Sequence, residues 1–402
     1  MREMKDSGNM WIGATPETWK MIPLKYLASY NDEVLSENTD DEFEFDYIEI
    51  GSVQYGRGII YTEHMKFKNA PSRARRIVRK DDIIVSTVRT YLKAVATIPA
   101  CNNSLIASTG FIVIRPHKVL PRFMNYALLS ESFISLVESH STGISYPAIN
   151  SVDVVKFKIP VPCRSEQERI AAFLDAECAE IDAVLEKTRA SIEEYKKLKQ
   201  AVITQAVTKG IRGDRPMKDS GIEWIGDIPV EWDYTKAKNC VNIQNGSDPK
   251  TEGSIPVYGS GASSFKTCGE YKEGPSVLIG RKGATLHIPH YISTKFWNVD
   301  TAFNVYAKPN FDLKFYFYCA CSFDYRFYIS QTTLPSMTQT AYENMFLPLP
   351  SNDEQRAIAS YLDNRCEEID ALIWKKQECL VEIENYKKSL IYEYVTGKKE
   401  VV

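Results

Sequence analysis

Two stretches of the chain carry apolar residues at the seven-residue spacing of a coiled-coil helix. The first runs without Pro or Gly up to Lys209, and the second keeps the same register. The expected seam positions are Leu174, Ile181, Leu185, Ile192, Tyr195 and Val202 in the first stretch and Leu362, Ile369, Ile373, Leu380, Ile383 and Leu390 in the second, with Cys178 and Cys366 at matching places. Each stretch, of about 45 residues, predicts a helix on the order of 65 Å long.

The two predicted helices are expected to pair with each other. Thr188 and Lys376 occupy equivalent seam positions, so neither seam is apolar enough to stand alone. An antiparallel pair buries both seams, and the identical register favours this intramolecular pair. The alternative is that each helix packs separately on its neighbouring domain. At the start of the first helix, Ser165 and Glu168 have the spacing of a capping box.

The segments before each helix show the pattern of strands. Short apolar runs such as DIIVSTV, GFIVI, PSVLIG and FNVYA are β-branched or aromatic and are bounded by Gly, Pro, Asn or Asp. One segment, RFMNYALLSESFISLVES, has the spacing of a helix. The sequence therefore predicts an α+β protein, with two strand-rich mixed domains separated by two long helices that form an antiparallel intramolecular coiled coil.

The chain repeats itself once. The stretch MKDSGNMWIGATPETW from Met4 nearly recurs as MKDSGIEWIGDIPVEW from Met217. The stretch IPVPCRSEQERIAAFLDAECAEIDAVL from Ile159 recurs as LPLPSNDEQRAIASYLDNRCEEIDALI from Leu347. Between these anchors only scattered matches survive, so the framework is duplicated while the variable parts have diverged. The expected divisions are a lead segment with a first domain at 1–158, a spacer helix at 159–210, the repeated lead segment with a second domain at 211–346, and a second spacer helix with a C-terminal tail at 347–402.

Composition indicates the compartment and the charge. The chain has 402 residues, 44% of them apolar, which is enough for more than one core. It has no apolar leader, no run near the roughly 20 apolar residues that cross a bilayer, and nine scattered cysteines, so we expect a cytoplasmic protein without a membrane segment. The formal net charge is only −3, but residues 66–93 are strongly basic and follow the acidic stretch 32–49. Local polarity of this kind predicts a basic patch.

The basic stretch and its counterpart in the second domain are interleaved with tyrosines, which favours contacts with nucleic acid. Lys and Arg neutralise phosphates, and the planar guanidinium of Arg donates two hydrogen bonds to guanine. The candidates for DNA binding are Arg73, Arg75, Arg76, Ser86, Arg89, Tyr91 and Lys93 in the first domain and Tyr258, Arg281, Lys282 and Lys295 in the second. Lys272 belongs to the same basic interval of the second domain. The alternative for any single cation is a solvated surface charge.

Motifs of catalysis are missing from the sequence. It has no GxxxxGK[ST] phosphate loop, no nucleophile elbow, and no methyltransferase motif beside a cofactor glycine motif. His287 and His290, followed by Cys319 and Cys321, are ligand types that suit zinc, but Pro289 makes HxxH a poor helical pair and the cysteines lie in an aromatic run. We therefore expect no catalytic residue, no metal site and no cofactor in this chain.

The repeated layout resembles the specificity subunit of type I restriction-modification systems. The resemblance covers nearly the whole chain: the opening MKDSGxxWIGxxPxxW, a variable domain, a helix that begins after IPVP and ends in AVTKG, and a second copy of all three. It implies two target recognition domains, each reading one half of a split, non-palindromic sequence in double-stranded DNA, and two helices that fix the spacer. It also implies two modification subunits that use S-adenosylmethionine to methylate adenine, and two restriction subunits that use ATP and Mg.

By the same resemblance this chain is a non-catalytic subunit, and Glu166–Lys209 and Glu354–Gly397, with the two lead segments, are its candidate docking surfaces. An antiparallel pair presents two similar surfaces and can bind two copies of one partner. Two other classes of protein stay open. One is a coiled-coil scaffold that binds only proteins, and the other is a divergent stand-alone enzyme that modifies DNA.

Overall fold

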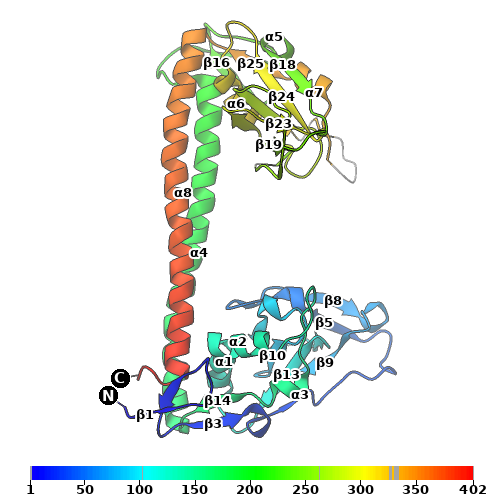
Figure 1. Ribbon diagram of the computed structural model, residues 1–402, viewed down its shortest axis with the longest axis vertical. Coiled ribbons are helices and arrows are strands. Elements are labelled where there is room, and N and C mark those ends of the chain that lie inside the picture. Colours follow the sequence, from blue (N-terminus) through cyan, green and yellow to red (C-terminus); the bar gives the residue numbers. More distant parts are fainter. Residues whose placement is uncertain (1, 102, 262, 326–327, 330–334, 402) are drawn as a thin grey trace. The chain divides into compact units, whose positions relative to one another are not determined.

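The computed structural model describes residues 2–101, 103–261, 263–325, 328–329 and 335–401 (Figure 1). The chain divides into two compact units, each of which combines one strand-rich domain with part of each long helix. Unit 1 contains residues 1–187 and 379–402, and unit 2 contains residues 188–378. Because these units cut both helices, they do not test the four consecutive divisions expected from the sequence, which stay a prediction.

The described part of unit 1 contains two four-stranded sheets. The first, in the order β11-β10-β13-β4, is antiparallel throughout, and its strands are Val95–Thr97, Ile83–Ser86, Phe111–Pro116 and Ala28–Tyr30. The second, in the order β8-β5-β12-β9, has the parallel pair β5 and β12, and its strands are Glu63–Lys66, Glu44–Ile48, Leu105–Ser108 and Ala74–Val78.

Smaller elements complete unit 1. Its two-stranded ladders are β1 (Met4–Asp6) with β2 (Ala14–Pro16), β3 (Lys20–Pro23) with β14 (Lys158–Val161), and β6 (Val53–Gln54) with β7 (Gly58–Ile59). Its short α-helices are α1 (Pro121–Leu129), α2 (Glu131–Ser139) and α3 (Ser151–Val154). Its single-turn helices are η1 (Leu24–Tyr26), η2 (Ile50–Ser52), η3 (Phe67–Asn69) and η4 (Thr90–Leu92).

Unit 2 repeats this topology with fewer described strands. Its antiparallel sheet has the order β18-β24-β21-β22, with strands Val241–Asn245, Ala302–Ala307, Ser276–Gly280 and His290–Ile292. Its second sheet, β20-β19-β23, again contains a parallel pair, and its strands are Lys266–Cys268, Ile255–Tyr258 and Trp297–Asn298. The ladders are β15 (Met217–Asp219) with β16 (Asp227–Pro229) and β17 (Asp233–Lys236) with β25 (Phe346–Leu349), and the short helices are α5 (Ala237–Cys240), α6 (Leu313–Ser322) and α7 (Gln339–Asn344).

Central strand β10 shows why the first domain has two sheets. Ile83 and Val85 join the core beside α1 and α2, whereas Ile84 joins the core between the two sheets. All three side chains are buried because successive residues of a strand point to opposite faces and both faces of β10 are covered. The predicted helix in RFMNYALLSESFISLVES is two helices in the structure, because Ser130 is extended and its hydroxyl donates to the Ala127 carbonyl at 2.6 Å.

The long helices are α4 (Arg164–Lys209) and α8 (Asn352–Val395), green and orange to red in Figure 1. In unit 1 the rings of Phe173 and Tyr394 lie 4.5 Å apart, and Lys387 pairs with Asp182 at 2.7 Å. In each unit the residue numbers rise along α4 as those of the contacting residues fall along α8, so the pairing is antiparallel. The predicted fold class is confirmed. Neither these helices nor any other in the described part of the chain is long and apolar enough to cross a membrane.

In unit 2 the same antiparallel order places Lys199 against Asp370 at 2.6 Å. Seam residue Lys376 is accommodated because its ammonium lies over the ring of Tyr195, 5.6 Å from the centroid. The predicted seam residues of both units are buried or half-buried: Leu174, Ile181, Leu185, Ile192, Tyr195, Val202, Leu362, Ile369, Ile373, Leu380, Ile383 and Leu390. The helices also pack on the domains, since the core of unit 1 includes residues of α4 and α8.

The predicted capping box of α4 is wrong. The helix begins at Arg164, so Ser165 lies inside it and Cys163 holds the N-cap position, with its carbonyl accepting from the Gln167 N–H at 3.0 Å. Glu168 instead forms an ion pair with Arg164 at 3.0 Å, one turn apart on the helix surface. The capping residue lies two positions earlier than the pattern indicated.

Candidate nucleic-acid interface

In each unit a buried tryptophan joins the lead segment to the start of a long helix. The indole N–H of Trp19 donates to Glu166 Oε2 at 3.0 Å in unit 1. That of Trp232 donates to Glu354 Oε2 at 2.9 Å in unit 2. Both tryptophans are 1% exposed. We call the tryptophan and its glutamate, together with the arginine and the glycine that contact them, the tryptophan joint.

An arginine and a glycine complete each tryptophan joint. Arg2 and Arg215 form ion pairs at 2.5 Å with the same glutamates, and their guanidinium carbons lie 6.0 and 5.3 Å from the indole centroids. Against the indoles lie Gly397, after α8 in unit 1, and Gly210, after α4 in unit 2, at φ +76° and +77°. A Cβ on Gly397 would lie 3.2 Å from the ring, and one on Gly210 3.1 Å, so glycine suits both the left-handed conformation and the close contact.

A buried glutamine forms a second matched contact, the glutamine joint. Each carboxamide donates to a proline carbonyl just before the long helix and accepts from the backbone N–H at the N-cap of a domain helix. The bonds are Gln167 to Pro162 (2.9 Å) and Leu120 (2.8 Å), and Gln355 to Pro350 (2.9 Å) and Asp312 (2.8 Å). Because the oxygen and the nitrogen of each carboxamide both have a partner, the buried side chain is stabilised and fixes the domain helix to the long helix.

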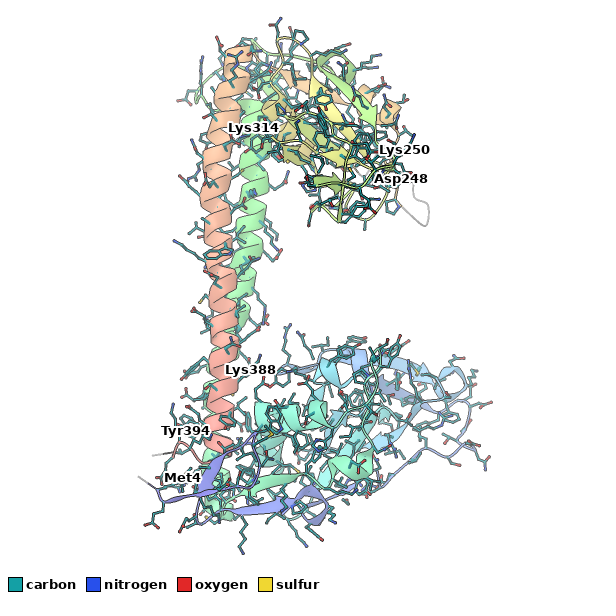
Figure 2. The ribbon with its side chains drawn as sticks, in the orientation of Figure 1. Met4, Asp248, Lys250, Lys314, Lys388 and Tyr394 are labelled. Carbon is teal, nitrogen blue, oxygen red and sulfur yellow. The ribbon has the colours of Figure 1, made fainter. Side chains whose placement is uncertain are left out.

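The third contact, the aspartate joint, is formed by an aspartate in the first half of each long helix. Each carboxylate accepts from a tyrosine hydroxyl and pairs with a cation on the same domain helix, and Figure 2 labels Lys314 of the second set. The pairs are Asp175 with Tyr126 (2.7 Å) and Arg122, and Asp363 with Tyr318 (2.8 Å) and Lys314 (2.5 Å). Burial raises the pKa of both tyrosines, which keeps them protonated as donors. The three joints together are the frame.

Beyond the frame, the loop after the central strand of each antiparallel sheet is fixed by equivalent backbone bonds. In unit 1 the N–H of Thr87 donates to Gly110 at 2.8 Å, and its carbonyl accepts from Ile149 at 2.9 Å. In unit 2 the N–H of Arg281 donates to Thr301 at 2.8 Å, and its carbonyl accepts from Met337 at 2.9 Å. The next residues form the bridges Val88 to Ala148 and Lys282 to Ser336.

These bonds join two segments in each unit, which we call the reading loops. They are residues 87–93 with 142–148 in unit 1, and residues 281–286 with 335–338 in unit 2. Each pair follows a central strand and precedes a short helix, α3 or α7. The backbone bonds that anchor these segments are therefore duplicated, although the side chains beside them are not.

Candidate residue Arg89 is exposed at the tip of the first reading loop. It adopts φ +51°, a left-handed conformation that non-glycine residues rarely take, and its guanidinium lies over the ring of Tyr146 at 5.3 Å. Tyr91 is also exposed. Lys93 is at φ +52° too, but its ammonium lies 3.5 Å from Glu138 and 3.9 Å from Glu131 on α2. Strained residues held in place by bridges are typical of functional loops.

Candidate residues beside β9 and on β9 and β10 differ in accessibility. Arg73 is exposed, and its carbonyl accepts from Thr109 next to Gly110, which places Arg73 near the first reading loop. Arg75 turns back over the ring of Phe67 at 4.9 Å. Arg76 is half-buried, and burial lowers its pKa. Ser86, at the end of β10, is only 2% exposed and cannot touch DNA without a rearrangement, because the strand is covered on both faces.

Part of the basic stretch is neutralised by the acidic stretch that precedes it. Strands β5 and β8 pair, and Glu42, just before β5, contacts Lys66 at 2.7 Å and Lys68 at 2.5 Å. Glu33 pairs with Arg79 at 2.5 Å. The basic patch inferred from residues 66–93 is therefore smaller than the sequence indicated, since the strand pairing brings the opposite charges together.

Candidate residues of unit 2 lie at two ends of β21. Arg281 and Lys282 follow the strand and line a pocket of about 270 Å³ with Asn245. Lys295 lies beyond β22, toward the start of β21, where it pairs with Glu273 at 3.4 Å. A five-residue strand spans roughly 16 Å, so the structure does not bring Lys295 to the reading loops.

Two further residues of unit 2 are held inside the domain. Tyr258 is half-buried and packs on a small core that includes Phe296. The Lys272 ammonium donates to Asn298 at 2.8 Å and to Asn304 at 2.6 Å, and burial lowers its pKa. Both asparagines are fully buried, so this lysine stabilises the interior rather than presenting a cation to a ligand.

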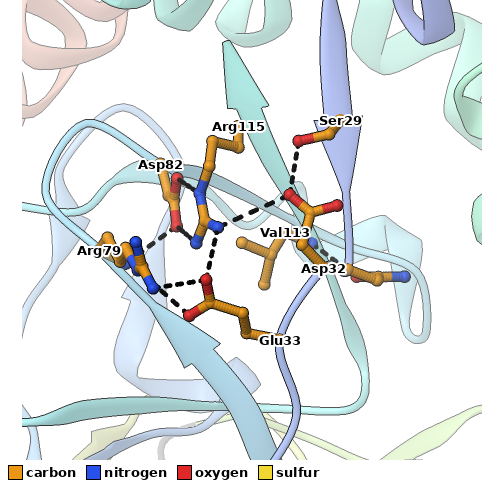
Figure 3. Close-up of polar contacts among 8 residues, drawn as sticks. Ser29, Asp32, Glu33, Arg79, Asp82, Val113 and Arg115 are labelled. Atoms are coloured by element: carbon orange, nitrogen blue, oxygen red, sulfur yellow. Dashed lines mark hydrogen bonds and ion pairs between the residues drawn. The ribbon is translucent and has the colours of Figure 1, made fainter. Parts of the chain in front are cut away.

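Sequence reasoning missed the charged cluster beside the start of β10, at the end of the strand opposite the first reading loop (Figure 3). Asp82, at the start of β10, accepts two hydrogen bonds from Arg115 of β13, at 2.9 and 2.8 Å, and one from the Arg79 N–H at 2.9 Å. Glu33 pairs with Arg115 at 3.1 Å. The bidentate pair fixes the strand that leads into residues 87–93. In unit 2 the residue before β21 is Pro275, which carries no charge.

The ligand types noted at His287, His290, Cys319 and Cys321 do not form a cluster. Cys319 is buried in the core of unit 2, and burial lowers the pKa of His290. Over the ranges that the structure describes, no three His, Cys, Asp or Glu side chains are placed to hold a metal ion.

Comparisons with known proteins agree with this layout. The chain matches the family described as type I restriction modification DNA specificity domain over residues 16–194 and 229–380. It is 25% identical to the type I restriction enzyme MjaVIII specificity subunit of Methanocaldococcus jannaschii, covering 96% of this chain and 94% of that protein. It is 22% identical to the MjaX specificity subunit, described as putative, of the same organism, covering 97% and 96%. A chain solved in work on complex assembly and conformational transition of the type I R-M system shares its fold, with a TM-score of 0.74 at 22% identity over 96% of this chain and 99% of that chain.

Proposed function

Because the chain belongs to the family of type I restriction modification DNA specificity domains, we propose that it reads a bipartite, non-palindromic sequence in double-stranded DNA, one half-site for each unit. The observation that carries this proposal is the contrast between the frame and the reading loops. The joints repeat in both units with the same residue types, except for Arg122 in place of Lys314, whereas the side chains on the reading loops differ. Two similarly attached surfaces with different chemistry suit two different half-sites.

The proposal extends to the long helices and to partners. The paired helices α4 and α8 fix the spacer between half-sites, and the duplicated segments Glu166–Lys209 and Glu354–Gly397 offer equivalent docking surfaces for two modification subunits. Two restriction subunits complete the full complex. Catalysis, with S-adenosylmethionine, ATP and Mg, belongs to those partners, which act where the cell's DNA lies, in the cytoplasm. The function proposed for this chain is recognition of the DNA sequence.

The experiment that tests the proposal maps methylated adenines in DNA from cells that carry the whole system. We expect one motif with two defined parts separated by a fixed spacer. No such motif, together with no two-part enrichment when the assembled complex selects from random duplexes, would favour a protein-binding scaffold. Labelled methyl transfer by the purified chain alone would favour a stand-alone enzyme.

Two variants test the division of labour. Exchange of Leu24–Lys158 for the equivalent domain of a relative is expected to change one half of the motif, and a change in both halves would contradict one reader per half-site. Insertion of seven residues into α4 alone is expected to alter or abolish acceptance of the native spacer. An unchanged spacer preference would remove the role of the helices.

A further inference from the structure

Reading loop 142–148 presents an apolar tip to solvent. Ile144 is fully exposed and Tyr146 is 67% exposed. Reciprocal backbone bonds of 2.9 Å between Thr142 and Ala148 close the base of the loop, and Gly143 at φ +108° forms its turn. A short loop that is closed at its base holds its tip away from the core.

A cation lies beside this tip. The Arg89 guanidinium stacks on Tyr146, and among the described residues it makes no ion pair. The nearby acidic residues of α2, Glu131 and Glu138, face Lys93 instead. The surface is therefore a small apolar projection beside one uncompensated positive charge. That combination suits the negatively charged grooves of DNA better than an apolar protein surface, where an unpaired cation would lose its hydration.

We propose that Ile144 and Tyr146 are specificity residues of unit 1, which contact base edges in a groove of one half-site while Arg89 supplies the adjacent polar or phosphate contact. This inference rests on the proposed function and adds residues to it that no basic or motif signal in the sequence marked. Apolar side chains read bases through the thymine methyl group or by wedging at a base step. In unit 2 the bonded residues Ser336 and Met337 match Ala148 and Ile149 of unit 1. The sequence positions that match Ile144 and Tyr146 are therefore Thr332 and Leu334, which lie outside the described residues.

The test uses the whole system in cells, with methylated adenines mapped for the wild type and for the double variant Ile144→Ser, Tyr146→Ala. We expect the wild-type motif to lose definition at one or more adjacent positions of one half, with the other half and the spacer unchanged. The matched control is Tyr26→Ala. Its ring is 56% exposed and lies under Lys25 at 5.0 Å, so it has the same chemistry in the same unit, outside the reading loops. The control motif should equal that of the wild type.

Binding by the purified complex separates base contact from backbone contact. On a duplex with the mapped target, the double variant should bind roughly tenfold or more weakly, while binding to a random duplex and its dependence on salt stay unchanged, because no charge is removed. The single variant Tyr146→Phe, which keeps the aromatic ring, should retain most of the wild-type affinity. Arg89→Gln should reduce the salt dependence by about one phosphate contact, or relax one motif position.

The outcomes distinguish the two proposals. A wild-type system without a two-part motif contradicts the proposed function itself. A wild-type motif that survives in the double variant overturns only this inference, as does equal weakening on target and random duplexes. Because both side chains are exposed, unchanged thermal unfolding of the variant should verify that a lost half-site does not reflect lost folding.

Discussion

Units 1 and 2 have matching contacts at their joints but different side chains at their reading loops. Glu166 and Glu354 hold a tryptophan and an arginine at distances that agree within 0.1 Å. The reading loops share backbone bonds, but one presents Arg89 beside an exposed tyrosine and the other presents Arg281 beside a pocket. The difference teaches that burial and multiple partners constrain the joints, whereas the reading surface is free to diverge once its backbone is fixed.

The two tryptophan joints also differ in connectivity. In unit 2, Gly210 and Arg215 are separated by four residues of continuous chain. In unit 1 the corresponding Gly397 and Arg2 lie far apart in sequence, and Arg2 pairs with Glu400 at 2.9 Å across that gap. The repeat in space therefore combines the start of one long helix with the end of the other, which a sequence divided into consecutive repeats does not display.

The most severe test of equivalence removes the tryptophans. Trp19→Ala and Trp232→Ala each delete a buried ring and its hydrogen bond, and each should destabilise its own unit by about 3–5 kcal/mol. Peptide-resolved hydrogen exchange of the complete chain measures the two units separately. We expect similar losses of protection, in unit 1 for the first variant and in unit 2 for the second. Strongly unequal losses would break the equivalence of the frame.

The charged cluster beside the start of β10 should distinguish the units. Asp82→Asn replaces a buried carboxylate that accepts three hydrogen bonds, and it leaves Arg115 with a weaker partner. The expected loss is about 3 kcal/mol, close to the range for breaking a buried ion pair, and it should be confined to unit 1. Arg79→Ala is the control. Its side chain is 64% exposed, so its loss should be small, and a large effect there would show that surface pairing rather than the buried pair holds the start of β10.

The sequence predicted the helices, their register and the repeat because these depend on periodic burial, which local patterns record. It placed the strands correctly at DIIVSTV and PSVLIG for the same reason. It overestimated the basic patch, since pairing of Lys66 with Glu42 depends on which strands become neighbours. It also overlooked Tyr146, because an exposed tyrosine in a loop has no pattern until the fold places Arg89 beside it.

The glutamine joints offer a cleaner comparison, because the two side chains are identical in type and in partners. Gln167→Ala and Gln355→Ala each leave a buried proline carbonyl and a backbone N–H without their partner, at an expected loss of about 2 kcal/mol. The losses should be equal within about 0.5 kcal/mol if the sites are independent and equivalent. Urea unfolding followed by unit-resolved exchange measures both. A double variant whose loss differs from the sum would indicate that the frames are coupled.

The smallest effect concerns the N-caps of the long helices, which lie beside the joints and carry different residues in the two units. Ser351 Oγ accepts from the Glu354 N–H at 3.3 Å, whereas Cys163 holds the same place before α4, and its thiol is a weaker acceptor. Cys163→Ser should therefore raise the Tm of unit 1 by roughly 1–3 °C, and Ser351→Cys should lower that of unit 2 by a similar amount. Cys379→Ser, at an exposed cysteine within α8, controls for loss of a thiol and should change neither. Opposite shifts of similar size would show that the two helix starts differ in stability only through the oxygen or sulfur atom of the N-cap side chain. If Cys163→Ser gave no rise in Tm, the first backbone N–H groups of α4 would have another partner. The two helix starts would then be equivalent in their tryptophan contacts but not in their N-caps.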